Sequence, residues 1–472
     1  MRKWISLTIV LTGFTISSSF ASLDACRIIR EFTGEIEDGE FGFSVANAGD
    51  VNNDSVNDFV IGAPYLISSG NEIGRAYIIS GSTYEVIYSF EGEKENDNFG
   101  LKVSTAGDVN GDGYDDIIVG APSLKVYDSG PGKAYVFSGV NGGLLYEYEG
   151  VEVNDLLGIA VAAAGDVNND GFSDFLIGSP GHNEFRGRVL LISGQAGDTL
   201  LVFVGDSTLD ELGRAVCGVG DLDQDGFDDV MAGATGYGYH PGKAYVYSGQ
   251  TGNVIHLFLG VDELDGFGRS LSSISDLDGD GIRDLIVGDD GYDSHRGKVY
   301  VFSGESGDLI YALEPDDFSQ FGFSVSSIGD VDEDGFEEVV VGAYAENKAG
   351  QIIRGSVYIF SGFDGAFITK YEDNLDLAYF GISVANAGDV NSDGLDDIMV
   401  GAFWDGVSLH NAGKVYFLSV NSCFGNRGDL NHDGSDSNML DLNFLVNRIF
   451  RSGPAPACSE EGDVNSDGIS AN

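Results

Sequence analysis

The side chains best suited to chemistry in this chain are carboxylates and amides that recur in seven acidic loops of nine residues. The second loop places Asp108, Asn110, Asp112 and Asp116 at positions 1, 3, 5 and 9, with Gly113 at position 6, where the chain must turn sharply. The backbone carbonyl of position 7 can supply one more oxygen. Ca2+ takes about six to eight oxygen ligands in flexible geometry, whereas Mg2+ demands a stricter octahedron. The loop therefore predicts a calcium site.

All seven loops keep this arrangement, so the sequence predicts about seven Ca2+ ions. One such loop could be an ordinary turn, but seven with the same spacing could not. Ser55 replaces the glycine of the first loop, and this site is predicted to be the weakest. The predicted ligands, with the carbonyl of position 7 included, are Asp50, Asn52, Asp54, Val56, Asp58; Asp108, Asn110, Asp112, Tyr114, Asp116; Asp166, Asn168, Asp170, Phe172, Asp174; Asp221, Asp223, Asp225, Phe227, Asp229; Asp276, Asp278, Asp280, Ile282, Asp284; Asp330, Asp332, Asp334, Phe336, Glu338; and Asp389, Asn391, Asp393, Leu395, Asp397.

The spacing of the loops identifies the elements that must hold them. Their first aspartates are 58, 58, 55, 55, 54 and 59 residues apart. Within the second repeat, apolar segments bounded by glycine predict strands at 99–107, 117–122, 133–139 and 144–150, and no stretch has helical periodicity. Four antiparallel strands repeated seven times predict an all-β, seven-bladed β-propeller over residues 22–420.

The ends of the repeat region predict how the ring closes. The seventh repeat stops after a third strand at 414–418, and residues 27–34 have the pattern of the missing fourth strand. The N-terminal strand is therefore expected to complete the last blade. Cys26 and Cys423 would flank this strand pair and could form a disulfide, but Cys423 could equally pair with Cys458, because both precede a tail loop. Cys217 lies in a first strand and is expected to be a buried free thiol.

Composition limits the classes of function. The chain has 472 residues, with 76 Asp and Glu against 24 Lys and Arg, for a formal charge of −52. Nucleic-acid binding requires clustered basic residues and is excluded as a function. The 30 Phe and 21 Tyr supply a real core, which excludes a disordered acidic chain.

The N-terminus has the features of a secretory signal. Arg2 and Lys3 precede an apolar run that is too short to cross a bilayer, and small residues precede a cleavage site after Ala21. Residues 1–21 are predicted to be a signal peptide, which places the protein outside the cell or on its surface. A rival interpretation, acylation of Cys26 as a lipoprotein, fits poorly because Asp24 stands where a small neutral residue is expected. No later segment could span a membrane.

The motifs at the blade boundaries identify a family resemblance. Phe-Gly pairs open five repeats at Phe41, Phe99, Phe267, Phe321 and Phe380, and Gly-Ala-Pro triplets begin at Gly62 and Gly120. Leu157 and Leu212 replace the phenylalanine in two repeats. The pattern resembles the FG-GAP repeats of integrin α-chain propellers. The resemblance implies calcium on the lower face and a ligand surface on the upper one.

Aromatic residues in the loops between second and third strands are candidates for that ligand surface. They are Tyr65, Tyr127, Tyr237, Tyr239, Tyr292, Tyr344 and Trp404. They predict an adhesion or recognition module for an extracellular protein or glycan. The alternative is an extracellular enzyme that degrades carbohydrates or phosphodiesters on the upper face, although no catalytic motif is present.

Residues 421–472 differ from the repeats. Asp429, Asn431 and Asp433 begin a calcium loop that could hold one further ion, and residues 440–450 have helical spacing. A second loop begins at Asp463 without a following helix. The tail is similar to a dockerin, which implies a cohesin-like partner, but it is incomplete.

Overall fold

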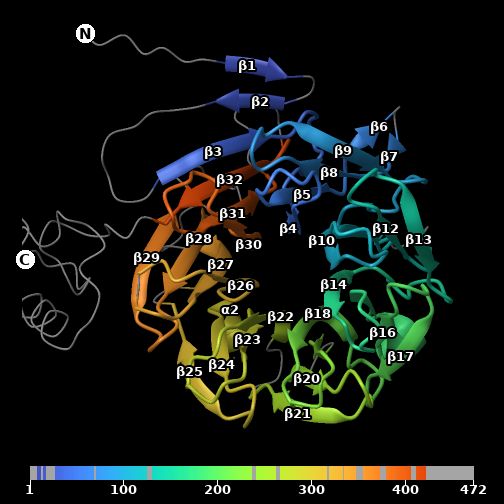
Figure 1. Cartoon of the computed structure of the whole chain (residues 1–472), viewed down its shortest axis with the longest axis vertical. Coiled ribbons are helices and arrows are strands. Elements are labelled where there is room, and N and C mark those ends of the chain that lie inside the picture. The colour runs from blue at the N-terminus through green and yellow to red at the C-terminus, as the bar shows by residue number, and fades with distance from the viewer. Residues whose placement is uncertain are drawn as a thin grey trace, which may run out of the picture.

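Seven antiparallel sheets stand side by side around a central axis in the computed structural model (Figure 1). The structure describes residues 8–11, 14–17, 27–68, 71–124, 130–236, 241–261, 266–315, 318–332, 334–346, 354–372, 379–404 and 411–420. Each sheet contributes four strands to the ring, and the first strand of each lies nearest the axis. The predicted seven-bladed propeller is confirmed.

The strands fall into four concentric positions. The first strands are β4 (Ser44–Gly49), β10 (Lys102–Gly107), β14 (Ala160–Gly165), β18 (Leu212–Gly220), β22 (Phe267–Ile274), β26 (Ser324–Ile328) and β30 (Ser383–Gly388). The second strands are β5 (Asp58–Ala63), β11 (Asp116–Ala121), β15 (Asp174–Ser179), β19 (Asp229–Ala234), β23 (Asp284–Asp289), β27 (Glu338–Glu346) and β31 (Asp397–Ala402). The third strands are β8 (Arg75–Ile79), β12 (Lys133–Phe137), β16 (Arg188–Ile192), β20 (Lys243–Tyr247), β24 (Lys298–Phe302), β28 (Arg354–Phe360) and β32 (Lys414–Ser419). The fourth strands are β9 (Val86–Glu91), β13 (Leu144–Glu149), β17 (Thr199–Val204), β21 (Val254–Leu259), β25 (Leu309–Leu313), β29 (Phe367–Glu372) and, for the seventh blade, β3 (Arg27–Thr33).

The N-terminal strand closes the ring, as predicted. β3 pairs antiparallel with β32, and Phe32 lies opposite Val415 in this register. Two further strands, β1 (Thr8–Leu11) and β2 (Phe14–Ser17), form a hairpin whose second strand pairs with the outer edge of β3. This hairpin falls within residues 1–21, for which cleavage as a signal peptide stays a prediction.

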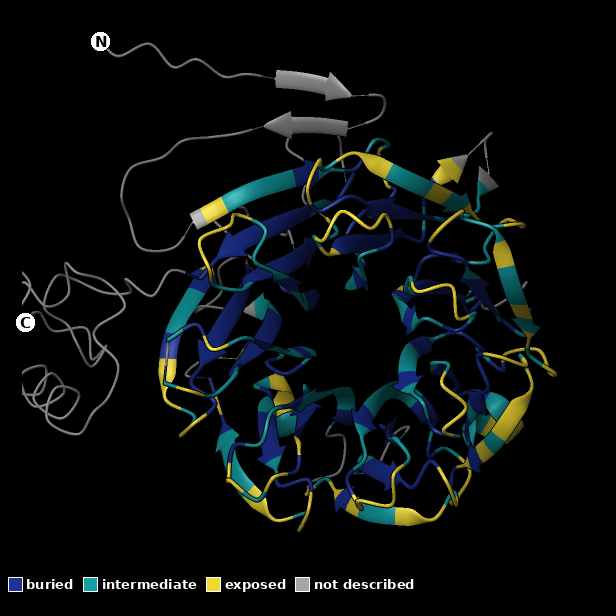
Figure 2. Cartoon of the chain, in the orientation of Figure 1, coloured by how far each residue is buried: buried dark blue, intermediate teal, exposed yellow. Residues whose placement is uncertain are grey.

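The apolar core lies mainly between neighbouring blades. Every residue of six of the second strands is buried, whereas the fourth strands expose about every other side chain (Figure 2). Seven apolar clusters each combine side chains of two adjacent blades, and one joins Val60 and Ile78 of the first blade to Phe99, Val103 and Ile117 of the second. Because each blade buries its faces against both neighbours, the blades stabilise one another around the ring.

Glycine at the blade boundaries has a packing reason. Gly100 has φ +88°, and its amide donates to the carbonyl of Gly120 at 3.0 Å. A Cβ on Gly120 would collide with the backbone of Gly158 in the next blade. The same contact is made around the ring, which explains why Leu157 and Leu212 can replace phenylalanine while the following glycine is kept.

Two short helical segments occur within the repeats, where no helical periodicity was predicted. α1 (His182–Phe185) and α2 (Tyr292–His295) connect second and third strands in the third and fifth blades. Asn183, Glu184 and Phe185 all have positive φ, so α1 is a single left-handed turn. A small two-stranded hairpin of β6 (Ile67–Ser68) and β7 (Asn71–Glu72) occupies the corresponding connection of the first blade.

Several predictions lie outside the described residues. They concern the tail ligands Asp429, Asn431 and Asp433, the helix at 440–450, and the pairing of Cys26, Cys423 and Cys458. Cys217 is a free, half-buried thiol in β18. Within the described part of the chain, no helix has the length and apolarity that crossing a bilayer requires.

Candidate functional site

The seven acidic loops all lie at one end of the ring, which we call the acidic-loop face. Each loop joins the first strand of a blade to the second, and position 9 is the first residue of the second strand. Alternating strand direction places the connections between second and third strands, and those between blades, at the opposite end, which we call the upper face. The seven acidic loops therefore share one face of the ring.

The carboxylate of position 9 is the anchor of each loop. Asp116 is fully buried, and its two oxygens accept the amide hydrogens of Val109 at 3.1 Å and of Gly139 at 3.0 Å. The bond from the amide of position 2 occurs in all seven loops. This side chain therefore stabilises its own loop and links the loop to the turn after the third strand.

The carboxylates of positions 1 and 5 shape the exposed part of the loop. Asp108 accepts the amides of Asp112 at 3.1 Å and Gly113 at 2.9 Å, and Asp112 accepts that of Tyr114 at 3.1 Å. Equivalent bonds from positions 5, 6 and 7 recur in every loop. These bonds fold the exposed part of each loop around the carboxylates of positions 1 and 5.

The loops of blades four to six carry aspartate at position 3 and bring at least three carboxylates together. In blade six, one oxygen from each of Asp330, Asp332, Asp334 and Glu338 lies within 4.8 Å of all the others. Asp221, Asp223 and Asp225 form a similar group, as do Asp276, Asp278 and Asp284. In the other four loops asparagine occupies position 3, and its side-chain amide nitrogen donates to the carboxylate of position 9.

Two buried oxygens at predicted ligand positions have no hydrogen-bond partner among the described residues. They are Oδ1 of Asn168 at position 3 and Oε1 of Glu338 at position 9. A buried acceptor without a partner is costly, and coordination to a cation would satisfy it. The donor set is made of hard oxygens only. The residues present therefore fit a Ca2+ ion.

The electrostatics of the loops also favour a cation. Burial raises the pKa of Asp116 to about 7, and the charges of Asp112 and Asp108 add to the rise, against the lowering effect of two amide hydrogen bonds. Burial likewise raises the pKa of Glu338 to about 9, with Asp332, Asp330 and Asp334 contributing. Like charges gathered in a partly buried site oppose ionisation, and a divalent ion would reverse that opposition.

Position 9 and position 5 should respond differently to loss of charge. Asp116→Asn replaces one of two buried acceptor oxygens with an NH2 group, which then faces a backbone N–H group. We therefore expect the free energy of unfolding to fall by about 1–3 kcal/mol, even in chelator. Asp112→Asn keeps an oxygen for Tyr114 and should unfold like the wild type in chelator, losing only stabilisation by calcium. Urea unfolding with and without EDTA measures both. Equal losses in EDTA would contradict this division of roles.

The first loop carries a backbone cost that the others avoid. Ser55 has φ +70° at position 6, where Gly113 has φ +88°. Because a left-handed conformation disfavours residues with a Cβ, Ser55→Gly should raise the free energy of unfolding in calcium by about 0.5–1 kcal/mol. Gly113→Ser is the matched reverse change, since nothing lies within 4 Å of a Cβ built there. Chemical denaturation of both variants would refute the idea if the two shifts had the same sign.

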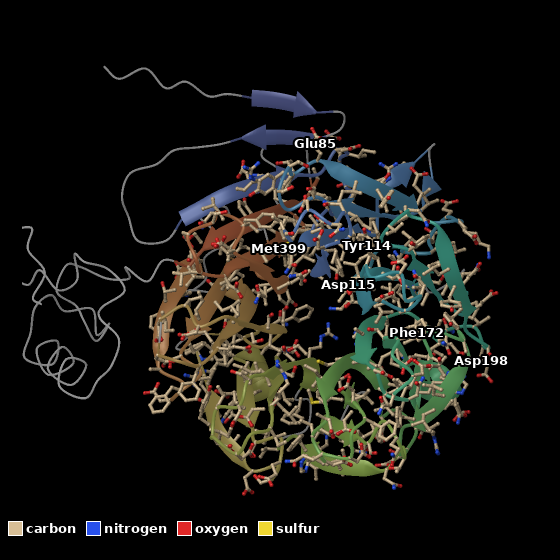
Figure 3. The ribbon with its side chains drawn as sticks, in the orientation of Figure 1. Glu85, Tyr114, Asp115, Phe172, Asp198 and Met399 are labelled. Atoms are coloured by element: carbon tan, nitrogen blue, oxygen red, sulfur yellow. The ribbon has the colours of Figure 1, made fainter. Side chains whose placement is uncertain are left out.

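The sequence prediction missed the residues at position 8. Asp228 accepts the amide of Asp166 at 2.8 Å, Glu337 accepts that of Ser275 at 3.0 Å, and Asp396 accepts that of Gly329 at 3.1 Å. Each bond joins one loop to the start of the loop in the preceding blade. Tyr114 and Asp115, at positions 7 and 8 of the second loop, lie near the central opening. Phe172 of the third loop follows them around the ring (Figure 3). Position 8 varies in residue type, so periodicity alone could not single it out.

On the upper face, aromatic side chains from the first, sixth and seventh blades form one connected group, which we call the aromatic arc. Its neighbouring ring centroids are 4.6 to 6.5 Å apart. All the rings are half-buried except that of Trp404, which is 38% exposed. The indole of Trp404 donates to Glu40 at 3.1 Å, which fixes its orientation. The members are Tyr65, Phe43, Phe403, Trp404, Tyr379, Tyr344 and Phe323.

The arc contains three of the seven aromatic residues predicted for the ligand surface, namely Tyr65, Tyr344 and Trp404. Tyr344 was expected in a loop, but β27 continues through it to Glu346. Tyr292 lies apart in α2, with the ammonium of Lys298 4.8 Å from its ring. Tyr127, Tyr237 and Tyr239 lie outside the described residues. Phe43, Phe323 and Tyr379 were not predicted, although the first two directly follow the Phe-Gly pairs.

These features define a β-propeller whose blades each carry an acidic hairpin loop. The model of the FG-GAP repeat matches residues 41–79, 99–137, 157–192, 212–247, 267–302, 321–360 and 380–418. These matches cover more than half of the chain. The protein belongs to the FG-GAP repeat family.

Curated relatives of the chain include several integrin alpha chains. The chain is 33% identical to integrin alpha-5 of Xenopus laevis over 227 residues, which are 44% of this chain and 21% of that relative. It is 37% identical to human integrin alpha-11 over 159 residues, 30% of this chain and 13% of the relative. The chain thus spans about a fifth or less of the length of these relatives. Among solved structures, the crystal structure of Saccharomyces cerevisiae Sqt1 has a TM-score of 0.47 at 12% identity, covering 78% of this chain and 82% of that one.

Proposed function

We propose that the protein is a secreted or cell-surface recognition module that binds an extracellular protein or glycan on its upper face, with Ca2+ holding the seven acidic loops. The observation that carries the proposal is the aromatic arc, a connected set of half-buried rings opposite the acidic loops. Partly exposed aromatic side chains supply large contact area at low entropic cost, as in many protein and glycan sites. Kinship with integrin alpha chains supports an adhesion role for the propeller.

Calcium has a structural part in this proposal. The acidic loops lie at the opposite end of each blade from the arc, so the ion would not contact the ligand directly. It would hold the first two strands of each blade together, and the first strands carry the Phe-Gly boundaries from which Phe43 and Phe323 project. Loss of the ion is therefore expected to weaken ligand binding indirectly, through loss of the folded ring.

The proposal is tested by capturing ligands on glycan and extracellular-protein arrays with the full chain in calcium. We expect calcium-dependent binding that Tyr379→Ala combined with Trp404→Ala reduces by about tenfold or more, as for aromatic residues at binding hot spots. Phe363→Ala is the control, because this ring is 59% exposed in the turn after a third strand, on the acidic-loop face. Binding that the arc variant leaves intact would reject the arc as the site. Turnover of a bound glycan or phosphodiester would show that the protein is an enzyme and not a recognition module.

A further inference from the structure

A cavity of about 280 Å³ opens at the upper end of the central axis. Residues from all seven blades line it, from the start of each first strand. Most of these residues are apolar or small, but three are cationic: Lys102 in the second blade, Arg214 in the fourth and Arg269 in the fifth. The chain as a whole has a formal charge of −52, so a cavity lined by three basic residues differs in charge from the rest of the protein.

The three cations break the repeat at positions where the fold does not need them. The residue after the Phe-Gly or Leu-Gly pair is apolar in five blades, as in Phe43, Leu101 and Ile159, whereas it is arginine in blades four and five. The propeller therefore forms with either residue type at this position. Arginine here adds charge to the cavity at a position that the other five blades fill with an apolar side chain.

Lys102 stands at a position that is serine in four blades and alanine in two, and three of those serines link neighbouring blades. Ser44 accepts the amide of Val103 at 3.2 Å, and Ser383 accepts that of Val45 at 3.1 Å, each across a blade boundary. Ser324 makes the same bond to Val384 at 3.0 Å. Lysine cannot accept such a bond. The second blade thus lacks this inter-blade contact and presents an ammonium group to the cavity in its place.

No ion pair is recorded between these three cations and any described residue. The guanidinium of Arg269 lies over the ring of Phe323, 4.5 Å from its centroid, at the end of the aromatic arc. Glu211 and Asp290 are the nearby acids that act on the charge of Arg214, and Glu211 accepts a hydrogen bond from Thr235 at 3.2 Å. Three cations thus face two acids, and burial, together with the charge of Arg269, lowers the pKa of Lys102. Burial and the charge of Arg269 lower the pKa of Arg214 to about 10, so it remains charged at neutral pH.

We propose that this cavity binds the carboxylate or sulfate group of an acidic sugar, whose ring then lies against the aromatic arc. Lys102, Arg214 and Arg269 would contact the anionic oxygens, and Phe323 would join the anion site to the arc. Guanidinium groups favour planar or multidentate anions such as carboxylate and sulfate. The cavity is at the small end of the range for ligand pockets, which suits one sugar residue better than an extended peptide. The inference rests on the proposed recognition function and names the ligand class for it.

The test is a calorimetric titration of the full chain in calcium at constant ionic strength. The probes are D-glucuronate, D-galacturonate and galactose 6-sulfate, with D-glucose as the neutral comparison and a glutamate-rich peptide as the competing class. We expect binding of at least one acidic sugar and none of glucose. Uronate alone would identify carboxylate as the group bound, and galactose 6-sulfate alone would identify sulfate.

Substitutions taken from other blades keep the variants foldable. Lys102→Ser, Arg214→Ile and Arg269→Phe each install a residue that another blade carries at the same place. Each should weaken binding by about tenfold, the loss expected for one charge-assisted hydrogen bond. Lys94→Ser removes the same charge from an exposed site between the first and second blades and should leave binding unchanged. Melting temperatures within a few degrees of the wild type would show that the ring is intact.

Three results would overturn the proposal: no binding of any acidic sugar at millimolar concentration, equal affinity in the triple variant, or binding of the peptide in place of the sugars. The proposed recognition function has a separate readout. If the arc variant still loses its array ligand while no acidic sugar binds, the recognition face stands and the anion site is wrong. If neither experiment shows binding, both proposals fail.

Discussion

Removing calcium is expected to lower the melting temperature of the protein by about 10 °C or more. The seven loops carry 24 carboxylates at positions 1, 3, 5 and 9, and those of position 9 are buried. An ion that binds only the folded loop stabilises it by about 2.7 kcal/mol when its concentration is a hundred times Kd. For a large domain, a change of 1 kcal/mol in the free energy of unfolding shifts the melting temperature by about 2 °C or less. Several such sites together therefore account for the expected shift.

The measurement is a thermal melt followed by circular dichroism in EDTA, in Ca2+ and in Mg2+. Calcium added back after chelation should restore the melting temperature, and magnesium should restore less, because its octahedral preference fits these loops poorly. Isothermal titration would count about seven ions. A melt that is the same in EDTA and in calcium would contradict the structural role of the ion.

The periodic part of the molecule could be predicted from sequence. Asp108 and its six counterparts fix the blade count, because one repeat cannot bury its faces without neighbours. Glycine, apolar runs and chain direction then fix the strand order, and the observed strands begin and end within three residues of those expected for the second blade. The closing strand was predictable for the same reason: residues 27–34 match a pattern already seen six times. A repeated sequence shows the same structural pattern several times, so each copy supports the assignment of the others. A domain without repeats offers no such check.

The non-periodic part could not be predicted, because it depends on which blades the ring brings together. Phe43 and Phe403 are 360 positions apart in sequence, yet their ring centroids are 5.2 Å apart across the closure of the ring. Lys102, Arg214 and Arg269 are isolated residues in the sequence and meet only at the axis. Sequence reasoning assigned aromatic residues to a face by loop type, which found Tyr65 and Trp404. It missed Tyr379, which lies in a connection between blades.

Phe32→Ala is expected to destabilise the protein more than the same deletion in an interior blade. Phe32 is 1% exposed in β3 and packs against Phe417, with ring centroids 5.7 Å apart. Truncating a buried phenylalanine costs about 3–5 kcal/mol. Here β3 has no direct chain connection to the other three strands of the seventh blade, and its pairing with β32 and the packing of Phe32 hold it there. Weakening that pairing allows the ring to open between the first and last blades.

Phe258→Ala is the matched control, because Phe258 occupies the equivalent position in β21 and is 7% exposed. It should lose a similar packing energy, but β21 is held covalently at both ends between the fourth and fifth blades, so the ring stays closed. We therefore expect Phe32→Ala to give the lower melting temperature and faster hydrogen exchange in β30, β31 and β32, whereas Phe258→Ala should speed exchange locally in its own blade. Equal melting temperatures and equally local exchange would mean that the closing strand is no weaker than any other fourth strand. The stability of the ring would then come from the seven inter-blade cores, with closure adding nothing.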